Sequence, residues 1–297
     1  MKIAVTGSLG HISKPLTIEL IHKGHTVTVI SSNPQKQKDI EALGAIAAIG
    51  SIEDTAFLTA AFTGADAVYC MEPPVNFFDQ NIDIFNLHNA IANNYVKAIE
   101  QSGVKHVVHL SSIGAHTDKG NGMLAYHYYV EKIFEQLPTD IAITTMRPVG
   151  FYYNLLAFIR GIKTENAIIT NYGDLKEPWV SPIDIAAAIA EEITQSYNGR
   201  KVRYVASDEL TCNAVAQILG TAISKPNLQW TVIPDEQLLN NWLATGVNAT
   251  IAKGYVEMNA GRRTGVLYED YYRNRPVLGK TKLVDFAKEF AAVYNQQ

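Results

Sequence analysis

The chain has 297 residues, 47% of them apolar and 18% charged, so it is long and apolar enough to bury a substantial hydrophobic core. Its net charge of −4 argues against a nucleic-acid-binding protein, which usually carries a basic patch. Two cysteines, an N-terminus unlike a signal peptide and apolar runs too short to span a bilayer exclude the disulfide-rich secreted and membrane classes, and predict a cytoplasmic protein.

Short apolar runs alternate with amphipathic stretches in the first half of the chain. Lys2–Val5 is a predicted strand, and Ile12–His22 carries apolar residues at helical spacing. The further predicted strands are Thr26–Ile30, Ala45–Ile49, Ala67–Cys70, Val104–Leu110 and Ile141–Met146, and the further helices are Pro34–Leu43, Asp54–Phe62, Asn81–Gln101 and Gly122–Gln136. Strands this apolar with short connections predict the α/β class, with a doubly wound parallel sheet covered by helices on both faces.

The pattern changes after Pro148. Phe151–Ile162 is predicted to be an aromatic-rich helix, and a second helix is expected after Ser181, with Pro182 at its first position. Lys201–Val205 is a predicted strand that we expect to return to the main sheet. The remainder, 206–297, is expected to be mostly helical with one clear strand, Leu228–Val232.

A glycine turn, TGSLGHIS at 6–13, directly follows the first strand and opens the first helix. Gly7 permits the tight turn, Gly10 lets the backbone approach a pyrophosphate, and the helix N-terminus beyond favours the phosphates. Ser13, a small residue, stands where a third glycine is common. An ordinary glycine turn is the alternative, but this strand–turn–helix context predicts a dinucleotide site.

The end of the second strand bears on the choice between NAD and NADP. An acidic residue there would bind ribose hydroxyls, whereas this chain has Ser31, Ser32 and Asn33, with Lys36 within reach of a 2′-phosphate. The same residues also suit a helix N-cap on Asn33 with solvated lysines, and both interpretations can hold together. The sequence favours NADP(H) over NAD(H) as cofactor.

These signals predict the division of the chain. We expect a dinucleotide-binding Rossmann domain over 1–150, to which 174–205 returns, and a smaller, mostly helical substrate-side lobe over 151–297. The expected partner is a small-molecule substrate, with no nucleic acid and no membrane, and a homodimer is compatible with the sequence.

Further segments carry a resemblance to a known family. TGSLGHIS resembles the TGxxGxxG/S fingerprint of atypical short-chain dehydrogenases, and GADAV at 64–68, SGVKHVVHLSS at 102–112, TTMRPVGFYYN at 144–154 and SPIDIAAAIA at 181–190 are similar to the NmrA-like group. That group includes NADPH quinone reductases, triphenylmethane reductases and redox-sensing regulators. The resemblance covers most of residues 1–205, and the C-terminal third matches only loosely.

The resemblance implies that NADP(H) lies along the loops at the carboxyl ends of the strands. The implied cofactor-binding residues are Gly7, Ser8, Leu9, Gly10, His11, Ile12, Ser32, Asn33, Lys36, Met71, Glu72, Pro73, Ser111, Pro148, Val149, Gly150 and Phe151. An open α/β sheet binds its ligand at this edge.

Two overlapping frames compete for the catalytic position on the helix after the fifth strand. Tyr128 and Lys132 have the Tyr-x-x-x-Lys spacing with which short-chain dehydrogenases relay a proton. His127 and Glu131 instead resemble the reductase members, with His127 in place of the lysine and Met123 in place of the tyrosine. Neighbouring residues differ by about 100° around a helix, so only one frame can fully face the cofactor. Packing alone is a third explanation for the tyrosines.

A reductase of this kind can rely on the cofactor and an apolar slot that orients the acceptor. The candidate slot residues are Phe77, Phe78, Phe151, Tyr152, Tyr153 and Trp179. The histidines show no metal-ligand spacing, so no metal site is expected.

The leading hypothesis is an NADP(H)-dependent oxidoreductase that transfers a hydride to a small planar, quinone-like or conjugated acceptor, with His127 or Tyr128 positioning the substrate. The alternative is a non-catalytic NADP(H)-binding redox sensor that acts through a protein partner. A nucleotide-sugar epimerase is disfavoured, because its usual Tyr-x-x-x-Lys pair and acidic residue are not clear here.

Overall fold

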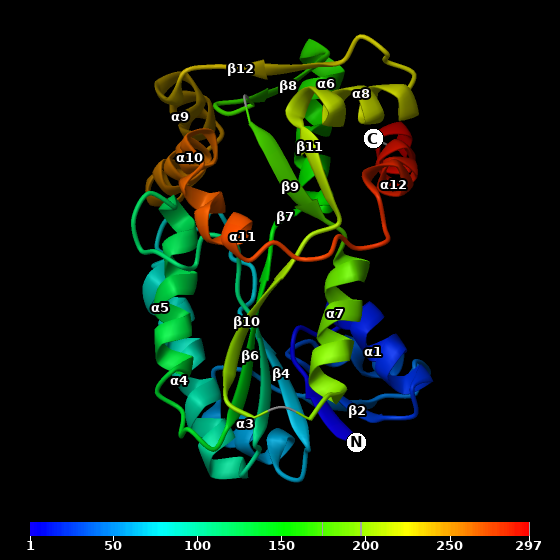
Figure 1. Ribbon diagram of the computed structural model, residues 1–297, viewed down its shortest axis with the longest axis vertical. Coiled ribbons are helices and arrows are strands. Elements are labelled where there is room, and N and C mark those ends of the chain that lie inside the picture. The colour runs from blue at the N-terminus through cyan, green and yellow to red at the C-terminus, as the bar shows by residue number, and fades with distance from the viewer. Residues whose placement is uncertain (174, 197, 297) are drawn as a thin grey trace.

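The computed structural model describes residues 1–173, 175–196 and 198–296. A large parallel sheet forms one end of the molecule, and two smaller sheets with their own helices form the other (Figure 1). The strand order of the large sheet is β10-β6-β5-β4-β1-β2-β3, and all neighbouring strands are parallel. Its strands are β1 (Lys2–Val5), β2 (Thr26–Ser31), β3 (Ile46–Ile49), β4 (Ala67–Met71), β5 (His106–Leu110), β6 (Ala142–Pro148) and β10 (Arg200–Val205).

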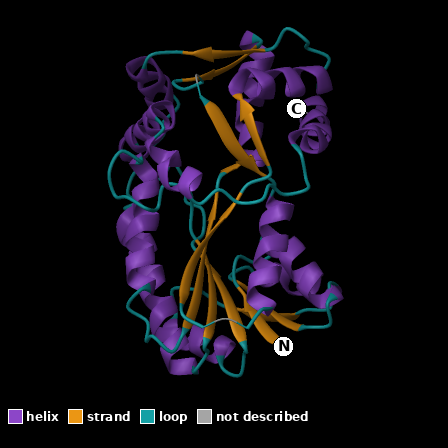
Figure 2. Ribbon diagram, in the orientation of Figure 1, coloured by secondary structure: helices purple, strands orange, loops and turns teal. Residues whose placement is uncertain are grey.

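Helices cover both faces of this sheet, which confirms the doubly wound α/β prediction (Figure 2). One face buries Leu16 and Leu20 against Ile185 and Ile189, and the other buries Phe62, Ile99 and Phe134 in a second apolar cluster. The first face belongs to α1 (Ser13–His22) and α7 (Pro182–Thr194); the second belongs to α3 (Thr55–Phe62), α4 (Ile84–Ser102) and α5 (Ala125–Phe134). The short helices η1 (Pro34–Lys36) and α2 (Gln37–Ala42) lead into β3, and η2 (Gly122–Leu124) leads into α5.

The strand order reverses between β1 and β4, which makes that edge of the sheet the topological switch point where an open α/β sheet binds its ligand. β10 pairs with β6 over its whole length, so the strand predicted at Lys201–Val205 does return to the main sheet. Residue 174, where we expected that return to begin, lies outside the described residues.

The other end of the molecule is built around a third apolar cluster that includes Tyr152, Leu155, Trp179, Leu219 and Phe290. Two small sheets belong to it, with strand orders β11-β9-β7 and β12-β8. Its strands are β7 (Gly150–Phe151), β8 (Ala167–Thr170), β9 (Lys176–Val180), β11 (Asp208–Thr211) and β12 (Gln229–Val232). The helices that pack into this cluster are η3 (Tyr152–Phe158), α6 (Ile159–Glu165), α8 (Cys212–Ala222) and α12 (Leu283–Gln296). A fourth apolar cluster contains residues of α9 (Asp235–Ala244) and α10 (Ala249–Thr264), and η4 (Val266–Tyr268) and α11 (Glu269–Arg273) pack into the first cluster, that of the large sheet.

Two predictions for this part of the chain were wrong in detail. Phe151–Ile162 is not one helix, because Phe151 pairs with Val180 in a sheet and the following residues form the 3₁₀ helix η3 before α6 begins. The second difference concerns strands that we did not predict: β8 and β9, which lie between residues 163 and 180, and β11, which lies after residue 206. The sequence of β11, DELT, is polar, and its buried Glu209 is paired with Arg275 in place of the apolar residue that usually marks a strand.

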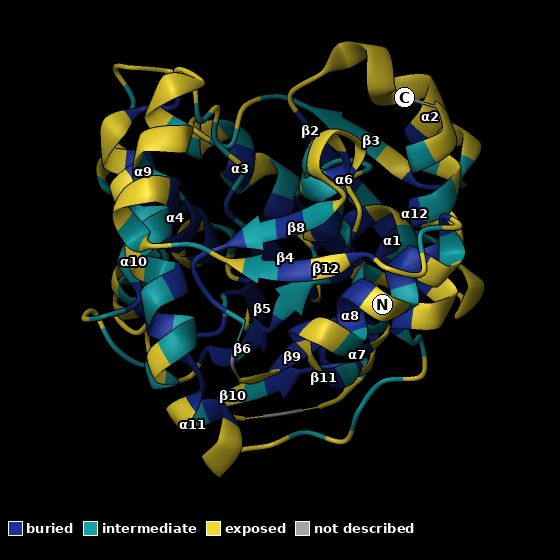
Figure 3. Cartoon of the chain, turned by 90° about the horizontal axis from the view of Figure 1, so that it is seen from above, coloured by how far each residue is buried: buried dark blue, intermediate teal, exposed yellow. Residues whose placement is uncertain are grey.

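Seen from above, the central strands β4, β5 and β6 are buried and the outward faces of the surrounding helices are exposed (Figure 3). Among the described residues, none of the helices combines the length and the apolar character needed to cross a membrane.

Candidate functional site

A cleft of about 1930 Å³ lies at the carboxyl ends of the central strands, between the large sheet and the second half of the chain. Its floor comes from the loops after β1, β4, β5 and β6, and its far wall comes from α9 and α10. The predicted cofactor-binding residues that line it are Gly7, Ser8, Leu9, Gly10, His11, Ile12, Ser32, Lys36, Met71, Glu72, Pro73, Ser111, Val149, Gly150 and Phe151.

Asn33 and Pro148, also expected in this site, lie outside the cleft lining. The Asn33 side chain accepts a hydrogen bond from the Gln35 backbone N–H at 2.9 Å and so caps η1. Pro148 is buried at the end of β6, where it pairs with Val205 of β10. Capping and sheet pairing therefore account for these two residues.

The turn after β1 has the geometry of a phosphate-binding turn. Gly7 has φ of +86°, and a Cβ at this position would collide with Met71 and Ser13. Ser13 donates to the Thr6 carbonyl at 2.8 Å, which fixes the start of α1 under the turn. Ile12 is the N-cap residue of α1, and its apolar side chain offers no acceptor to the first N–H groups of the helix. The turn therefore presents backbone donors to the cleft.

The loop after β2 adds a serine and a lysine to the same cleft. Ser31 is buried and accepts a hydrogen bond from Ser8 at 2.9 Å, which ties the two loops together. Ser32 and Lys36 line the cleft, and Lys36 pairs with Asp39 at 3.1 Å on the protein surface. An exposed pair of this kind contributes little, so Lys36 can turn to an anionic ligand.

A buried acid–histidine pair lies at the end of β4. Both carboxylate oxygens of Glu72 are within 3.2 Å of Nε2 of His109, and both side chains are almost fully buried. His88 on α4 contacts the Pro73 carbonyl through Nε2 at 3.1 Å. These contacts fix the loop that forms this part of the cleft floor.

The structure separates the two candidate catalytic frames on α5. His127 is buried and lines the cleft, whereas Tyr128 and Lys132 lie outside it. The Lys132 ammonium pairs with Glu135 at 2.9 Å, lies 5.5 Å from the centre of the Tyr128 ring, and is half exposed. Glu131, the second residue of the His127 frame, is buried behind the cleft.

His127 is held in its neutral form. Burial lowers the pKa of His127 well below its ordinary value, and the nearby His109, His88 and Arg147 side chains lower it further. Its Nδ1 is buried without a hydrogen-bond partner among the described residues. A neutral imidazole can donate one hydrogen bond and accept another, but it holds no readily released proton near pH 7.

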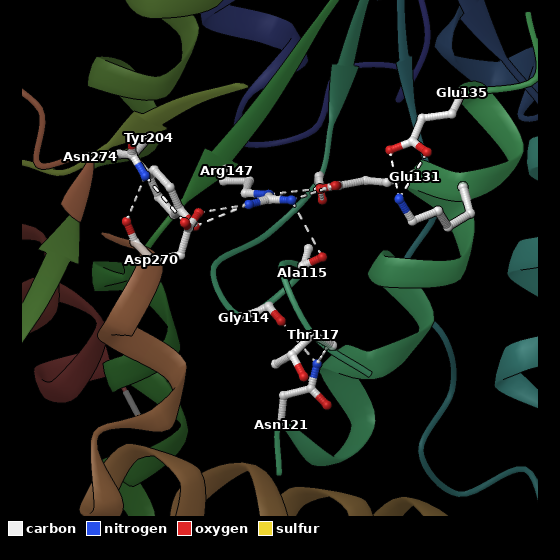
Figure 4. A network of polar contacts seen from close by, with 12 residues as sticks. Gly114, Ala115, Thr117, Asn121, Glu131, Glu135, Arg147, Tyr204, Asp270 and Asn274 are labelled. Carbon is white, nitrogen blue, oxygen red and sulfur yellow. Dashed lines mark hydrogen bonds and ion pairs between the residues drawn. The ribbon is translucent and has the colours of Figure 1, made fainter. Parts of the chain in front are cut away.

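The Ser111 hydroxyl at the end of β5 connects the cleft to a buried ion pair. Ser111 donates to Glu131 at 2.5 Å, and Arg147 of β6 donates to both oxygens of the same carboxylate, at 2.9 and 2.6 Å. Figure 4 shows Arg147 between Glu131 and Asp270, which come from opposite sides of the network. Sequence reasoning placed Ser111 in the cleft but did not connect it to Arg147.

Aromatic side chains form much of the wall. Phe77, Phe78, Phe151, Tyr153 and Trp179 line the cleft, as expected for an apolar slot. Tyr152, the sixth slot candidate, lies outside the lining because it is fully buried and donates to Asp208 at 2.7 Å.

The far wall contains aromatic cleft residues on α9 and α10 that the sequence did not reveal. Trp242 of α9 packs on Tyr255 of α10 with ring centroids 4.8 Å apart, and Tyr255 meets Phe77 at 5.3 Å. Arg262 also lines the cleft, paired with the buried Glu177 and lying 3.9 Å from the centre of the Tyr172 ring. These helices lie more than 150 residues after the glycine turn, and no local motif indicates that they line the same cleft.

Comparison with known proteins places this cleft in context. An NAD(P)H azoreductase from Xenophilus azovorans is 24% identical over 259 residues, which is 87% of this chain and 86% of the relative. The fold resembles the NADPH-dependent quinone oxidoreductase QOR2 from Escherichia coli, solved with NADPH, with a TM-score of 0.78, 21% identity and coverage of 97% and 99% of the two chains.

The triphenylmethane reductase from Citrobacter sp., solved with NADP(H), gives a TM-score of 0.75 with 21% identity, over 98% of this chain and all of the other. The family model described as the NmrA-like family matches residues 1–265. The match spans the glycine turn, the loops of the cleft floor and the helices of the far wall, and this chain belongs to the NmrA-like family.

Proposed function

We propose that this protein is an NADP(H)-dependent reductase that acts on a small planar, quinone-like or conjugated acceptor. The observation that carries the proposal is the continuity of one cleft, which runs from the phosphate-binding turn at Gly7 to the aromatic wall around Trp179 and Tyr255. A dinucleotide and a planar acceptor can therefore lie in contact in one water-poor space.

The residues of the cleft floor fit a phosphorylated dinucleotide. The backbone of the turn, with Gly7 at positive φ, would hold the pyrophosphate at the start of α1. Ser32 and Lys36 would receive a 2′-phosphate at the end of β2. The Glu72 carboxylate nearby lies within 3.2 Å of Nε2 of His109, which fixes its position in the cleft floor. Names of similar proteins, which include NAD(P)H- and NADPH-dependent reductases, support the same cofactor.

When bound, NADPH would supply the hydride for reduction of the acceptor. The aromatic wall would exclude water and hold a flat acceptor by ring contacts. His127, which is neutral and, like Ser111, lines the cleft, would orient the acceptor with a hydrogen bond, and the proton that completes the reduction would come from solvent. In this proposal Tyr128 and Lys132 have no direct role.

The test begins with titration of the protein by NADPH and by NADH, monitored by tryptophan fluorescence, because Trp179 and Trp242 line the cleft. A quinone or an azo dye is then added while nicotinamide absorbance is recorded. We expect tighter binding of NADPH than of NADH and acceptor-dependent oxidation. Binding without oxidation of NADPH across several acceptors would overturn the reductase and favour the redox sensor.

Variants of α5 separate the two catalytic frames. We expect His127→Gln to lower kcat/KM by at least about tenfold, because the orienting imidazole is lost. Lys132→Met tests the other frame, and we expect kcat/KM to stay within about twofold because an exposed lysine outside the cleft is removed. The reverse pattern would show that the Tyr128–Lys132 frame carries the reaction.

A further inference from the structure

We propose that Glu131 and Arg147 are positioning residues that turn the Ser111 hydroxyl into a hydrogen-bond acceptor, so that Ser111 takes an O–H or N–H donor of a ligand bound in the cleft. The inference rests on the proposed function. It adds the direction of one hydrogen bond, in which the ligand donates and Ser111 accepts. It also assigns a role to a buried ion pair that the reductase proposal leaves unused.

The direction of this hydrogen bond follows from the single proton of a serine hydroxyl. Ser111 donates that proton to Oε1 of Glu131 at 2.5 Å, and both side chains are buried. A hydroxyl has one proton and two lone pairs, so what Ser111 can still offer to the cleft is a lone pair. A ligand group that meets it must therefore donate.

The direction of this hydrogen bond is fixed by Arg147, which donates to both oxygens of the same Glu131 side chain. Arg147 donates from Nε to Oε1 at 2.9 Å and from Nη2 to Oε2 at 2.6 Å, the two-pronged geometry of a strong charge-assisted pair. Burial alone would lower the pKa of Arg147, but its hydrogen bonds and its attraction to Glu131 raise that pKa above its ordinary value. The guanidinium remains charged, and each Glu131 oxygen accepts.

Arg147 is in turn fixed from the second half of the chain. Its Nη1 donates to Asp270 of α11 at 3.0 Å and to the Tyr204 hydroxyl at 3.2 Å, and Tyr204 itself donates to Asp270 at 2.7 Å. Nη2 also contacts the Ala115 carbonyl in the loop after β5 at 3.4 Å (Figure 4). Contacts from α5, α11, β10 and this loop leave the guanidinium, and with it Glu131, a single orientation.

Asn121 holds the same loop from its other end. Its side-chain amide donates to the Gly114 carbonyl at 3.0 Å and to the Thr117 carbonyl at 2.7 Å. The loop that carries Ser111 is thus fixed at Ala115 by Arg147, and on either side of Ala115, at Gly114 and Thr117, by Asn121 (Figure 4). A serine held this rigidly is preorganised for one ligand donor.

Two sources can provide this donor: a hydroxyl or carboxamide group of the bound nucleotide, or a hydroxyl or amino group of the acceptor. Ser111→Ala removes the lone pairs, and Ser111→Thr retains a hydroxyl. We expect Ser111→Ala to weaken one ligand by about three- to tenfold, the range for one lost hydrogen bond, and Ser111→Thr to recover most of it. A rise in the Kd of NADPH assigns the donor to the nucleotide, and a rise in the KM of the acceptor alone assigns it to the acceptor.

Glu131→Gln tests the positioning role. The side-chain N–H of a glutamine can donate to the Ser111 oxygen, and the hydroxyl hydrogen of Ser111 can then point toward the cleft. We therefore expect a loss of ligand affinity similar to that of Ser111→Ala. In the double variant the two losses should not add, because both remove the same contact. Glu135→Gln is the matched control: it removes the same charge one turn further along α5, on the exposed surface.

Full additivity of Ser111→Ala and Glu131→Gln, or an unchanged Kd and KM in Ser111→Ala, would overturn the inference. The Ser111 variants leave the ion pair intact and retain the test if Glu131→Gln fails to fold. Failure of the proposed function looks different, because the wild-type protein itself would then bind no NADPH or oxidise none.

Discussion

Replacement of Gly7 by alanine tests the geometry of the proposed phosphate-binding turn. Gly7 has φ of +86°, a region that costs an L-residue about 1–2 kcal/mol. A Cβ there would also lie within 3.0 Å of Met71 Sδ and Ser13 Oγ, so side chains beneath the turn must move. Overpacking of this kind costs typically about 1–3 kcal/mol. Together, the two effects predict a loss of about 2–5 kcal/mol in the free energy of unfolding.

Gly24 provides the matched control for the backbone cost alone. Its φ is +81°, close to that of Gly7, but an added Cβ would meet nothing within 4 Å. Gly24→Ala should therefore lose only about 1–2 kcal/mol. Urea unfolding followed by tryptophan fluorescence measures both variants, and an unchanged m-value shows that the unfolded states remain comparable.

Nucleotide binding should separate the two variants further. Gly24 lies after α1, away from the cleft, so Gly24→Ala should leave the Kd of NADPH unchanged. Displacement of the turn in Gly7→Ala should raise that Kd by about tenfold or more, equivalent to one charge-assisted hydrogen bond. Equal losses of stability in the two variants would refute the packing of Gly7 against Met71 and Ser13. An unaltered Kd in a folded Gly7→Ala variant would refute the placement of the pyrophosphate.

Three further predictions concern charge. Ser32→Asp should raise the Kd of NADPH by about ten- to one hundredfold and that of NADH by much less. Like charges about 4 Å apart repel by about 1 kcal/mol in water and about 4 kcal/mol near a protein surface, and this fold-change corresponds to about 1.4–2.8 kcal/mol. Equal losses in fluorescence titrations would contradict the NADP(H) assignment. The pKa of His127 is lowered in the folded protein, so the unfolded chain binds a proton on this imidazole more tightly than the folded protein does. The contribution of His127 to the free energy of unfolding should therefore be complete above about pH 6.5 and should be lost as the pH drops toward the folded-state pKa. Urea unfolding at several pH values should show a shallower fall in His127→Gln, and identical slopes would argue against a buried neutral imidazole. Glu177→Gln should cost about 3–5 kcal/mol because it leaves Arg262 buried without its counter-charge, whereas Asp39→Asn, which breaks an exposed pair, should cost at most about 1 kcal/mol in the same assay.

The main sheet was predictable because its signals are local. The strands β1 to β5 are short apolar runs, as in Thr26–Ser31, and each of these five is followed along the chain by a helix. The glycine turn needs only the eight residues 6–13, and its positive φ at Gly7 follows from the residue type. Signals of this kind need no knowledge of distant contacts.

The second half of the chain was less predictable because its contacts are distant. β11 contains a buried glutamate whose charge is compensated by Arg275, 66 residues later, and which also accepts a hydrogen bond from Tyr271. Trp242 and Tyr255 lie on helices whose sequences carry no mark of a ligand site, and their place in the cleft depends on how those helices pack above β4. Tertiary packing, rather than local propensity, decides such positions.

The helix α5 shows where local reasoning reaches its limit. The Tyr128–Lys132 and His127–Glu131 pairs have identical spacing, so the motif alone cannot separate them. Besides Ala125 at its start, the buried residues of the helix are His127, Val130, Glu131 and Phe134, a stripe with the i, i+3, i+4, i+7 pattern of a face that packs on a sheet. Val130 and Phe134 can be recognised from the sequence as apolar residues three and seven positions after His127, on the same side of the helix. That stripe is difficult to recognise in the sequence, because large aromatic residues also occupy positions outside it, at Tyr126, Tyr128 and Tyr129. A choice between overlapping motifs on a helix therefore depends on the apolar residues one turn further along, and here these place His127 toward the cleft and Lys132 toward solvent.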